Sequence, residues 1–276
     1  MRARHSSAAH AWLRTRMPSA ARPYWDALLA FTGYADDLAD DPQVGLEARR
    51  RRYDRFVNGF FRILHDQHDP SSQSAVPSQP GDDVGGALCL AFQDFVQTWH
   101  IDEECLRAAH QAVRNHLVVS AYPTQSDLER YLHGACGQPT LWLSSVLELT
   151  DDGRTQGALS LGLGAGLLDC LVDLQEDLGI GKLYFPLEDL RRCGLRPADI
   201  EGAVSAREVP EPLCRLIDLQ VSRARHHFST AAAWAQRSQT QESEIILEWV
   251  TQARHALDRI AQNKASLFDV SLKRVV

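Results

Sequence analysis

The amino-acid sequence predicts an all-α protein built as one helical bundle. Apolar residues recur at helical spacing through most of the 276 residues, and runs that alternate apolar and polar residues between turn pairs are not evident. Hydrophobic residues make up 44% of the chain, and a single core can grow to roughly 250–300 residues before a chain divides. We therefore expect some eight to ten helices in a single domain that spans residues 1–276.

The expected helices follow one another along the chain. The first carries Trp25, Leu28 and Phe31 on one side, and the second carries Phe56 and Phe60 in the same way. Pro139 lies inside the fifth, where its missing N–H is expected to kink the helix. In order, the expected segments are 13–46, 53–64, 88–99, 103–119, 125–149, 157–178, 211–234 and 242–268.

The segment 69–86 interrupts this pattern with Ser, Pro, Gly and Gln, a composition typical of flexible loops. The chain before it is too short to bury a good core alone. The segment is therefore interpreted as an insertion within one domain, and not as a domain boundary.

Charge and cysteine usage exclude several classes of protein. The net charge is −7, from 29 Lys+Arg against 36 Asp+Glu, whereas a nucleic-acid binder needs a basic face. No uninterrupted apolar run reaches the roughly 18–20 residues of a membrane span, and no secretory signal is recognised. The six cysteines lack metal-site spacing and are expected to be reduced, buried thiols. A cytoplasmic protein without a transmembrane segment is predicted.

Two clusters of acidic residues stand above this background, about 130 residues apart. Residues four apart share one helix face, so Asp36 lies under Asp40, and Asp37 under Asp41. The second cluster interrupts an apolar stretch, where carboxylates need a compensating cation. Oxygen ligands on two facing helices suit Mg²⁺, which usually keeps substrate phosphates in its shell. The candidate Mg²⁺ ligands are Asp36, Asp37, Asp40, Asp41, Asp169, Asp173, Glu176 and Asp177.

Plainer interpretations of both clusters remain open. The first is also what a solvated helix C-terminus before Pro42 looks like, and the second would suit a helix end with surface acids. Asp169, Asp173 and Asp177 nevertheless fall at helical spacing in a segment that is otherwise apolar. Together the clusters favour a magnesium-bridged diphosphate.

The residues around these clusters resemble the squalene and phytoene synthases. Residues 31–41 are similar to the first aspartate motif of that family, and residues 169–190, with their GKLYFP tail, are similar to the second. The stretch 122–137, the SSAA of residues 6–9 and the closing segment 256–273 resemble further family elements. The resemblance implies a helical fold in which the two motifs face each other across a central cavity.

The resemblance also implies a role for individual residues. Asp36 and Asp40, with Asp173 and Asp177, would hold Mg²⁺ on the diphosphate of a prenyl donor, and Tyr131 matches a tyrosine near the reacting carbons. The implied catalytic residues are Tyr131, Asp36 and Asp173. The expected substrate contacts are Lys182, Tyr184, His133, Gln138, Ser6 and Trp142.

Several positions depart from the family pattern. Gly33 and Val172 stand where the motifs carry arginines, and His116 is the nearest residue to an expected aspartate. Arginine is well suited to phosphate, so one of two diphosphate subsites is expected to be weak. The hypothesis is that a prenyl cation is transferred to a neutral aromatic acceptor, in the manner of bacterial relatives that prenylate carbazole-type quinones.

Three alternatives are kept. The chain could condense two prenyl diphosphates head to head, cyclise one of them, or be a non-enzymatic scaffold whose acids are relics. A small-molecule acceptor and a prenyl diphosphate are the expected partners, in a monomer or homodimer. The sequence contains neither the acceptor's identity nor the donor's chain length.

Two other patterns, one basic and one of glycines, have plainer interpretations. The basic run 49–52, followed by Arg55, is interpreted as a solvated helix face in preference to a phosphate-attracting rim. Gly162, Gly164 and Gly166 do not follow a strand, so a nucleotide-binding loop is rejected. They are expected to let a bulky substrate or a second helix approach closely.

Overall fold

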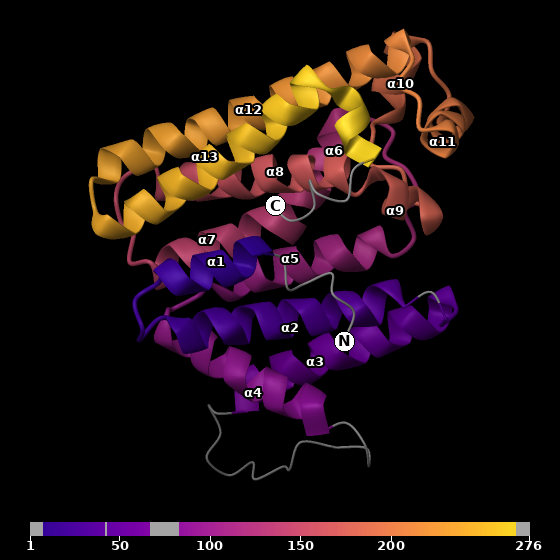
Figure 1. Ribbon diagram of the computed structural model, residues 1–276. Coiled ribbons are helices and arrows are strands. Elements are labelled where there is room, and N and C mark those ends of the chain that lie inside the picture. Colours follow the sequence, from indigo (N-terminus) through magenta and orange to yellow (C-terminus); the bar gives the residue numbers. More distant parts are fainter. Residues whose placement is uncertain (1–7, 42, 67–82, 269–276) are drawn as a thin grey trace.

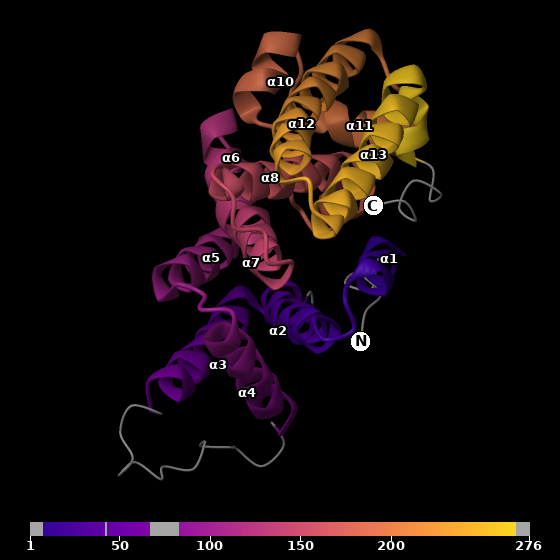
Figure 2. The ribbon, with the colours of Figure 1, turned by 90° about the vertical axis from the view of Figure 1, so that its left-hand side faces the viewer.

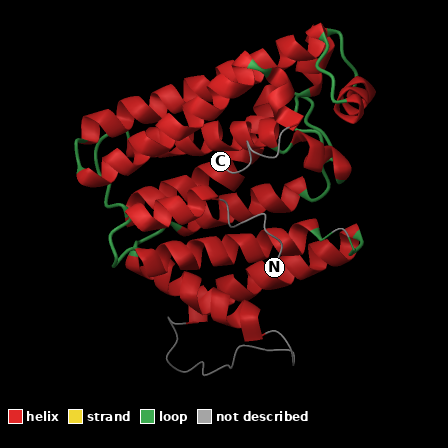
Figure 3. Ribbon diagram, in the orientation of Figure 1, coloured by secondary structure: helices red, strands yellow, loops and turns green. Residues whose placement is uncertain are grey.

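The computed structural model describes residues 8–41, 43–66 and 83–268, and it confirms the all-α class. Every labelled element in these ranges is helical, as Figure 3 shows. The β-pairing they contain is an isolated parallel bridge between Ala121 and Leu183. This bridge matters for the site, because it joins two loops that are far apart in sequence.

The described chain forms thirteen α-helices, one π-helical turn and one 3₁₀ turn, more elements than expected. In order they are α1 (Ala8–Arg16), α2 (Arg22–Asp40), α3 (Leu46–Asp66), α4 (Asp83–Thr98), α5 (Glu103–His116), α6 (Gln125–Leu132), η1 (His133–Gly137), α7 (Gln138–Val146), α8 (Arg154–Val172), α9 (Leu174–Gly179), α10 (Leu187–Cys193), α11 (Pro197–Ala206), α12 (Glu211–Ser238), α13 (Gln241–Gln262) and η2 (Lys264–Phe268).

The excess arises mainly because three expected helices are interrupted. Segment 13–46 divides into α1 and α2, and segment 157–178 divides at Asp173. Segment 125–149 divides at η1, where Gln138 N–H bonds to His133 O five residues back. Pro139 lies in the first turn of α7, so the expected kink takes the form of a π-turn just before it. Helices α10 and α11 are short and were not expected.

The helices form stacked layers (Figures 1 and 2). Helices α12 and α13 lie on one side, with α8 beneath them and α5 and α7 next. Helices α2, α3 and α4 form the opposite side. Helix α8 packs most extensively against α12 and also contacts α7 and η1. It therefore runs through the middle of the protein, and its last turn carries Asp169.

Glycines on α8 permit this packing, as expected. A Cβ at Gly164 would lie 3.1 Å from the Phe228 ring of α12, and one at Gly166 would lie 2.8 Å from Leu132. A Cβ at Gly162 would lie closest to the carbonyl oxygen of Cys136, then 2.5 Å from Thr140 Oγ1 and 2.7 Å from the carbonyl carbon of Cys136. The glycines thus admit neighbouring helices and η1.

Gly162→Ala is expected to destabilise the protein by ~1–3 kcal/mol, because a backbone carbonyl cannot rotate away as a side chain can. The melting temperature should fall by ~2–4 °C for each kcal/mol. Gly202→Ala on α11 is the matched control, since nothing lies within 4 Å of its Cβ. Equal melting temperatures for the two variants would show that η1 moves at little cost.

Helix α8 bears on the expected absence of a transmembrane segment. It is long and apolar enough to cross a membrane by length and hydropathy, although no uninterrupted apolar run of that length exists. Of its apolar window, 67% is buried inside the protein, as in a core helix.

Two further expectations can be compared with the structure. The expected loop 69–86 is wrong for residues 83–86, which form the first turn of α4. Residues 69–82 lie outside the described residues. All six cysteines are free thiols, as expected. The expected burial is confirmed for Cys89 and Cys170 and is wrong for the other four, which are half-buried.

Candidate active site

The first acidic cluster occupies the last turns of α2. The helix buries Trp25, Phe31 and Ala35 against the core. Asp36 and Asp40 are half-buried, whereas Asp37 is exposed. Asp41 follows the helix, accepts a hydrogen bond from Gln43 N–H at 3.0 Å and lies 3.8 Å from the Arg52 guanidinium.

The second cluster spans the junction between α8 and α9. Asp169 lies on α8, Asp173 between the helices and Asp177 on α9; Asp173 and Asp177 are half-buried and Glu176 is exposed. The helix expected over 157–178 is interrupted at Asp173, which lies between α8 and α9. Asp173 N–H still bonds to Asp169 O at 2.9 Å, and Asp177 N–H to Asp173 O at 2.9 Å. The one-turn spacing of the three carboxylates therefore survives the break.

The electrostatics place the two clusters near the same residues. Burial raises the pKa of the Cys136 thiol on η1, and Asp169 and Asp36 raise it further. Burial lowers the pKa of Lys182, and nearby Asp40 and Asp177 oppose that shift. One acid from each cluster thus acts on each of these two side chains.

Asp36 and Asp169 are poorly compensated carboxyl groups. Burial, then Asp40 and Asp37, raises the pKa of Asp36 to about 7. Burial, then Asp173, raises that of Asp169 to about 7 as well. Asp169 is nonetheless exposed to solvent. Its carboxyl group thus combines a raised pKa with access to solvent.

These residues fit a divalent cation held partly by its substrate. Oxygen donors without a countercharge suit Mg²⁺, which commonly takes one or two carboxylates plus phosphate oxygens. Among the described residues, no group of three or more His, Cys, Asp or Glu side chains could hold a metal ion by itself. The donor set matches a shared ion better than a structural one.

In metal-free protein, the stabilising effect of Asp36→Asn should grow as the pH rises from 5 to 7.5. The folded state holds the Asp36 proton up to about pH 7, whereas the ordinary pKa is 3.8. The folded state therefore binds more protons in this window, and wild-type stability declines with pH. His110 and His116, whose pKa values burial lowers to about 4 and about 3, act in the opposite sense.

The measurement is the difference in melting temperature between Asp36→Asn and wild type in the presence of a chelator. Taking that difference removes the histidine contribution, which both proteins share. A difference that stays constant or shrinks between pH 5 and 7.5 would contradict a raised pKa at Asp36.

Lys182 is placed differently from a free phosphate ligand. Gly181 adopts a positive φ of 76°, and the chain turns so that Lys182 N–H bonds to Asp177 O. The buried Lys182 ammonium donates to His116 O at 2.7 Å and to Val119 O. Two of its three hydrogens are therefore bound to backbone carbonyls, which leaves one for a phosphate oxygen.

Four aromatic rings gather beside Lys182, and we call them the aromatic cluster: His116, Tyr122, Tyr131 and Tyr184. The half-buried Tyr131 ring stacks on His116 with centroids 4.2 Å apart. His116 Nδ1 lies 2.6 Å from the Tyr122 hydroxyl, and Nε2 lies 2.7 Å from the Tyr184 hydroxyl. The sequence indicated Tyr131 and Tyr184, but it identified His116 only as a departure and missed Tyr122.

Gln138 and Trp142 lie one turn apart on α7, directly after the π-turn. Both are buried, with 5% and 2% exposure, and neither Gln138 Oε1 nor Trp142 Nε1 has a hydrogen-bond partner. His133, an expected substrate contact, is exposed and is not a member of the aromatic cluster. Ser6 lies outside the described residues.

Arg49 is the member of the basic run that differs from a solvated face. Its guanidinium donates to Ala39 O at 3.1 Å, and its Nε is buried without a hydrogen-bond partner. Burial is the main cause of the lowered pKa of Lys182, and the charge of Arg49 lowers that pKa further. Arg51, Arg52 and Arg55 are exposed. Arg49 therefore belongs to the surroundings of the site, and position alone could not have separated it from its neighbours.

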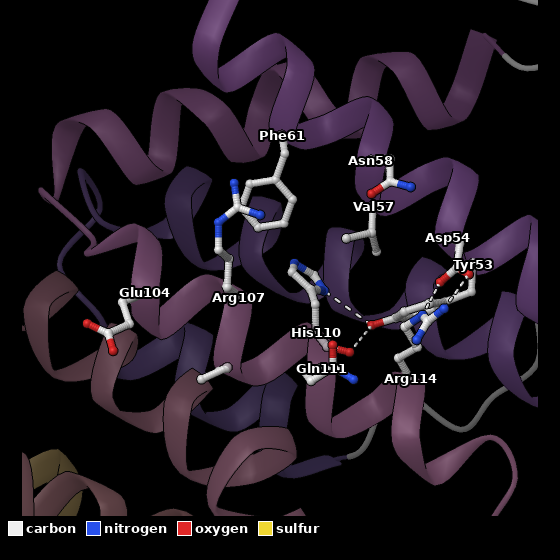
Figure 4. Close-up of a pocket in the computed structure, with 11 residues that line it drawn as sticks. Tyr53, Asp54, Val57, Asn58, Phe61, Glu104, Arg107, His110, Gln111 and Arg114 are labelled. Atoms are coloured by element: carbon white, nitrogen blue, oxygen red, sulfur yellow. Dashed lines mark hydrogen bonds and ion pairs between the residues drawn. The ribbon is translucent and has the colours of Figure 1, made fainter.

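A separate pocket of about 590 Å³ lies between α3 and α5 (Figure 4). Tyr53 at its edge donates to His110 O at 3.1 Å, and Arg114 forms an ion pair with Asp54 at 2.7 Å. The lining residues include none of the residues expected in the active site. The pocket is not a part of that site.

Comparisons with known proteins agree with this arrangement. The family described as squalene/phytoene synthase matches residues 3–276. A 15-cis-phytoene synthase from Synechocystis sp. is 27% identical over 229 residues, which cover 78% of this chain and 60% of that relative. The phytoene synthase of Synechococcus elongatus is 25% identical, with 91% and 79% covered. The chain thus spans less than two thirds of the Synechocystis enzyme.

Solved structures share the fold. The squalene synthase HpnC from Alicyclobacillus acidocaldarius aligns with a TM-score of 0.73 at 19% identity, covering 92% of this chain and 87% of that one. A dehydrosqualene synthase in complex with ligand gives a TM-score of 0.73 at 19% identity, covering 99% and 91%. With the family match over nearly its whole length, this chain belongs to the squalene/phytoene synthase family.

Proposed function

We propose that this protein is a Mg²⁺-dependent prenyltransferase that ionises an allylic prenyl diphosphate and transfers the prenyl group to an aromatic acceptor. The observation that carries the first half is the pair of acidic clusters, each with a carboxyl group whose pKa is raised to about 7 by burial and by neighbouring carboxylates. Family membership supports the same chemistry.

In this proposal Asp36 and Asp40 on one side, with Asp173 and Asp177 on the other, hold the metal and its diphosphate. Bound Mg²⁺ would supply positive charge to the leaving diphosphate oxygens. Lys182 offers its remaining hydrogen to the same oxygens. Tyr131, stacked in the aromatic cluster, presents a ring to the cation, and the buried surroundings keep water away.

The second half rests on what surrounds the acceptor. Gly33 and Val172, both buried, stand where the family motifs carry arginines, so neither position offers a guanidinium to a second diphosphate. Gln138 Oε1 and Trp142 Nε1 offer one buried acceptor and one buried donor without partners. An unpaired buried polar group costs ~1–3 kcal/mol, which a hydroxyl and a carbonyl on an aromatic substrate would relieve.

Head-to-head condensation of two prenyl diphosphates is the second candidate. It is favoured by the relatives, because the Synechocystis and Synechococcus proteins are phytoene synthases. In that case Arg49, whose charge acts on Lys182 and whose Nε has no hydrogen-bond partner, would be a candidate cation for the second diphosphate.

The test is incubation with Mg²⁺ and geranyl, farnesyl or geranylgeranyl diphosphate, with and without a hydroxylated aromatic quinone. Diphosphate release that needs the aromatic compound supports the proposal. A hydrocarbon dimer formed from the donor alone would overturn transfer to an aromatic acceptor and leave prenyl transfer intact.

Gln138→Leu is expected to raise the KM for the acceptor by ~10-fold and to leave the KM for the prenyl diphosphate unchanged. The variant removes Oε1, the buried oxygen without a partner, and with it one hydrogen bond to the acceptor. Gln93→Leu, another buried glutamine, is the control; its side chain bonds to Ile63 O at 2.9 Å. An unchanged acceptor KM in Gln138→Leu would place the acceptor elsewhere.

A further inference from the structure

The aromatic cluster contains a hydrogen-bonded chain whose proton positions can be deduced. His116 uses both ring nitrogens, with Tyr122 at Nδ1 (2.6 Å) and Tyr184 at Nε2 (2.7 Å). His116 and Tyr122 are buried, at 7% and 6% exposure, whereas Tyr184 is half-buried. The Lys182 ammonium is bound to the backbone carbonyl of His116 and disfavours a second positive charge there. His116 is therefore neutral and carries one ring hydrogen.

The position of that hydrogen follows from Tyr122. Among the described residues, the hydrogen-bond partner of the Tyr122 hydroxyl is His116 Nδ1. If Nδ1 carried the hydrogen, the buried Tyr122 O–H would have no acceptor, and such a group is costly. Tyr122 therefore donates to Nδ1, and the imidazole hydrogen is on Nε2.

This tautomer determines what Tyr184 does. His116 Nε2–H donates to the Tyr184 oxygen, so the Tyr184 hydrogen must point away from His116. Lys182 and Tyr184 are two residues apart on a segment without helix, so their side chains lie on the same side of it. Burial raises the pKa of Tyr184, and Asp177 and Asp40, one acid from each cluster, raise it further. The free O–H thus lies where both clusters act.

We propose that His116 and Tyr122 are positioning residues that hold the Tyr184 hydroxyl as a hydrogen-bond donor to the diphosphate of the bound prenyl substrate. The inference rests on the proposed function for the presence of that diphosphate. Tyr184 keeps its proton throughout. A donor already aimed at the leaving oxygens stabilises the charge that gathers there as the C–O bond breaks.

The test is calorimetric titration of inorganic pyrophosphate in the presence of Mg²⁺ into four proteins: wild type, Tyr184→Phe, His116→Phe and the double variant. Tyr184→Phe should weaken binding ~10-fold, as expected for a hydrogen bond to a charged group. His116→Phe keeps a ring in the stack and should weaken binding by no more than Tyr184→Phe. The double variant should bind like Tyr184→Phe, because the two residues act through one hydroxyl.

Tyr24→Phe is the matched control, since Tyr24 packs edge-on to Trp99 near the start of α2. It should bind pyrophosphate like wild type. Losses that multiply in the double variant, or unchanged affinity in Tyr184→Phe, would overturn the inference alone. A wild-type protein that binds no pyrophosphate with Mg²⁺ would overturn both it and the proposed function.

A second measurement needs no variant that might unfold. In ¹⁵N NMR of wild-type protein, His116 should show a protonated Nε2 and an unprotonated Nδ1. A protonated Nδ1, alone or with Nε2, would overturn the proposed orientation of Tyr184.

Discussion

Asp173→Asn is expected to lower the rate of diphosphate release from a prenyl diphosphate by about 10³-fold. Asp173 is the middle carboxylate of the second cluster, one turn from both Asp169 and Asp177. Asparagine keeps the size of the side chain and removes its charge. Loss of ~4 kcal/mol of metal-dependent stabilisation corresponds to about three factors of ten in rate.

Two readouts separate the expected causes. Release of pyrophosphate reports the chemistry, and calorimetry with Mg²⁺ and a diphosphate analogue reports binding. Asp94→Asn is the matched control, because Asp94 is an exposed carboxylate on α4 and should change neither. Activity retained in Asp173→Asn would remove Asp173 from the metal site. No binding by wild-type protein would favour a non-enzymatic scaffold.

The fold class and the acidic clusters could be predicted because both are local patterns. The apolar spacing around Phe31 and Phe60 is a property of single helices, and so is the four-residue spacing of Asp36 and Asp40. Tertiary packing then decided the details. Asp173 keeps its backbone hydrogen bonds but breaks the helix, and Pro139 produces a π-turn where only a kink could be foreseen.

The aromatic cluster could not be predicted, because no local pattern brings its members together. His116 and Tyr184 are 68 residues apart and meet through the bridge between Ala121 and Leu183. Leu187 N–H bonds to Tyr122 O at 2.9 Å and extends this pairing. The same long-range contacts hold Lys182 at the end of α5, where two of its three ammonium hydrogens are bound to the carbonyl oxygens of His116 and Val119. The presence of a basic residue in a sequence motif is thus weaker evidence for a phosphate contact than the hydrogen bonds that the residue makes in the structure.

Arg223→Ala is expected to lower the free energy of unfolding by ~3–5 kcal/mol and the melting temperature by about 10 °C. Arg223 on α12 pairs with Asp189 on α10, with 3.2 Å between Nη2 and Oδ1, and also donates to Gln125 on α6 at 2.8 Å. Asp189 is completely buried, so removing the guanidinium leaves a carboxylate without its main countercharge. Gln220, at 3.3 Å, is neutral, and Arg192, at 3.7 Å, is largely exposed.

Arg215→Ala on the same helix is the matched control. Its ion pair with Glu211 is exposed, at 3.4 Å, and its loss should cost no more than about 0.5 kcal/mol. Adding Asp189→Asn to Arg223→Ala should recover part of the stability, because the buried charge disappears with its partner. Equal losses in Arg223→Ala and Arg215→Ala would mean that Arg192 and Gln220 suffice for Asp189. We expect the ion pair to affect the site as well. It joins α10 to α12, and α10 directly follows the segment that carries Lys182 and Tyr184.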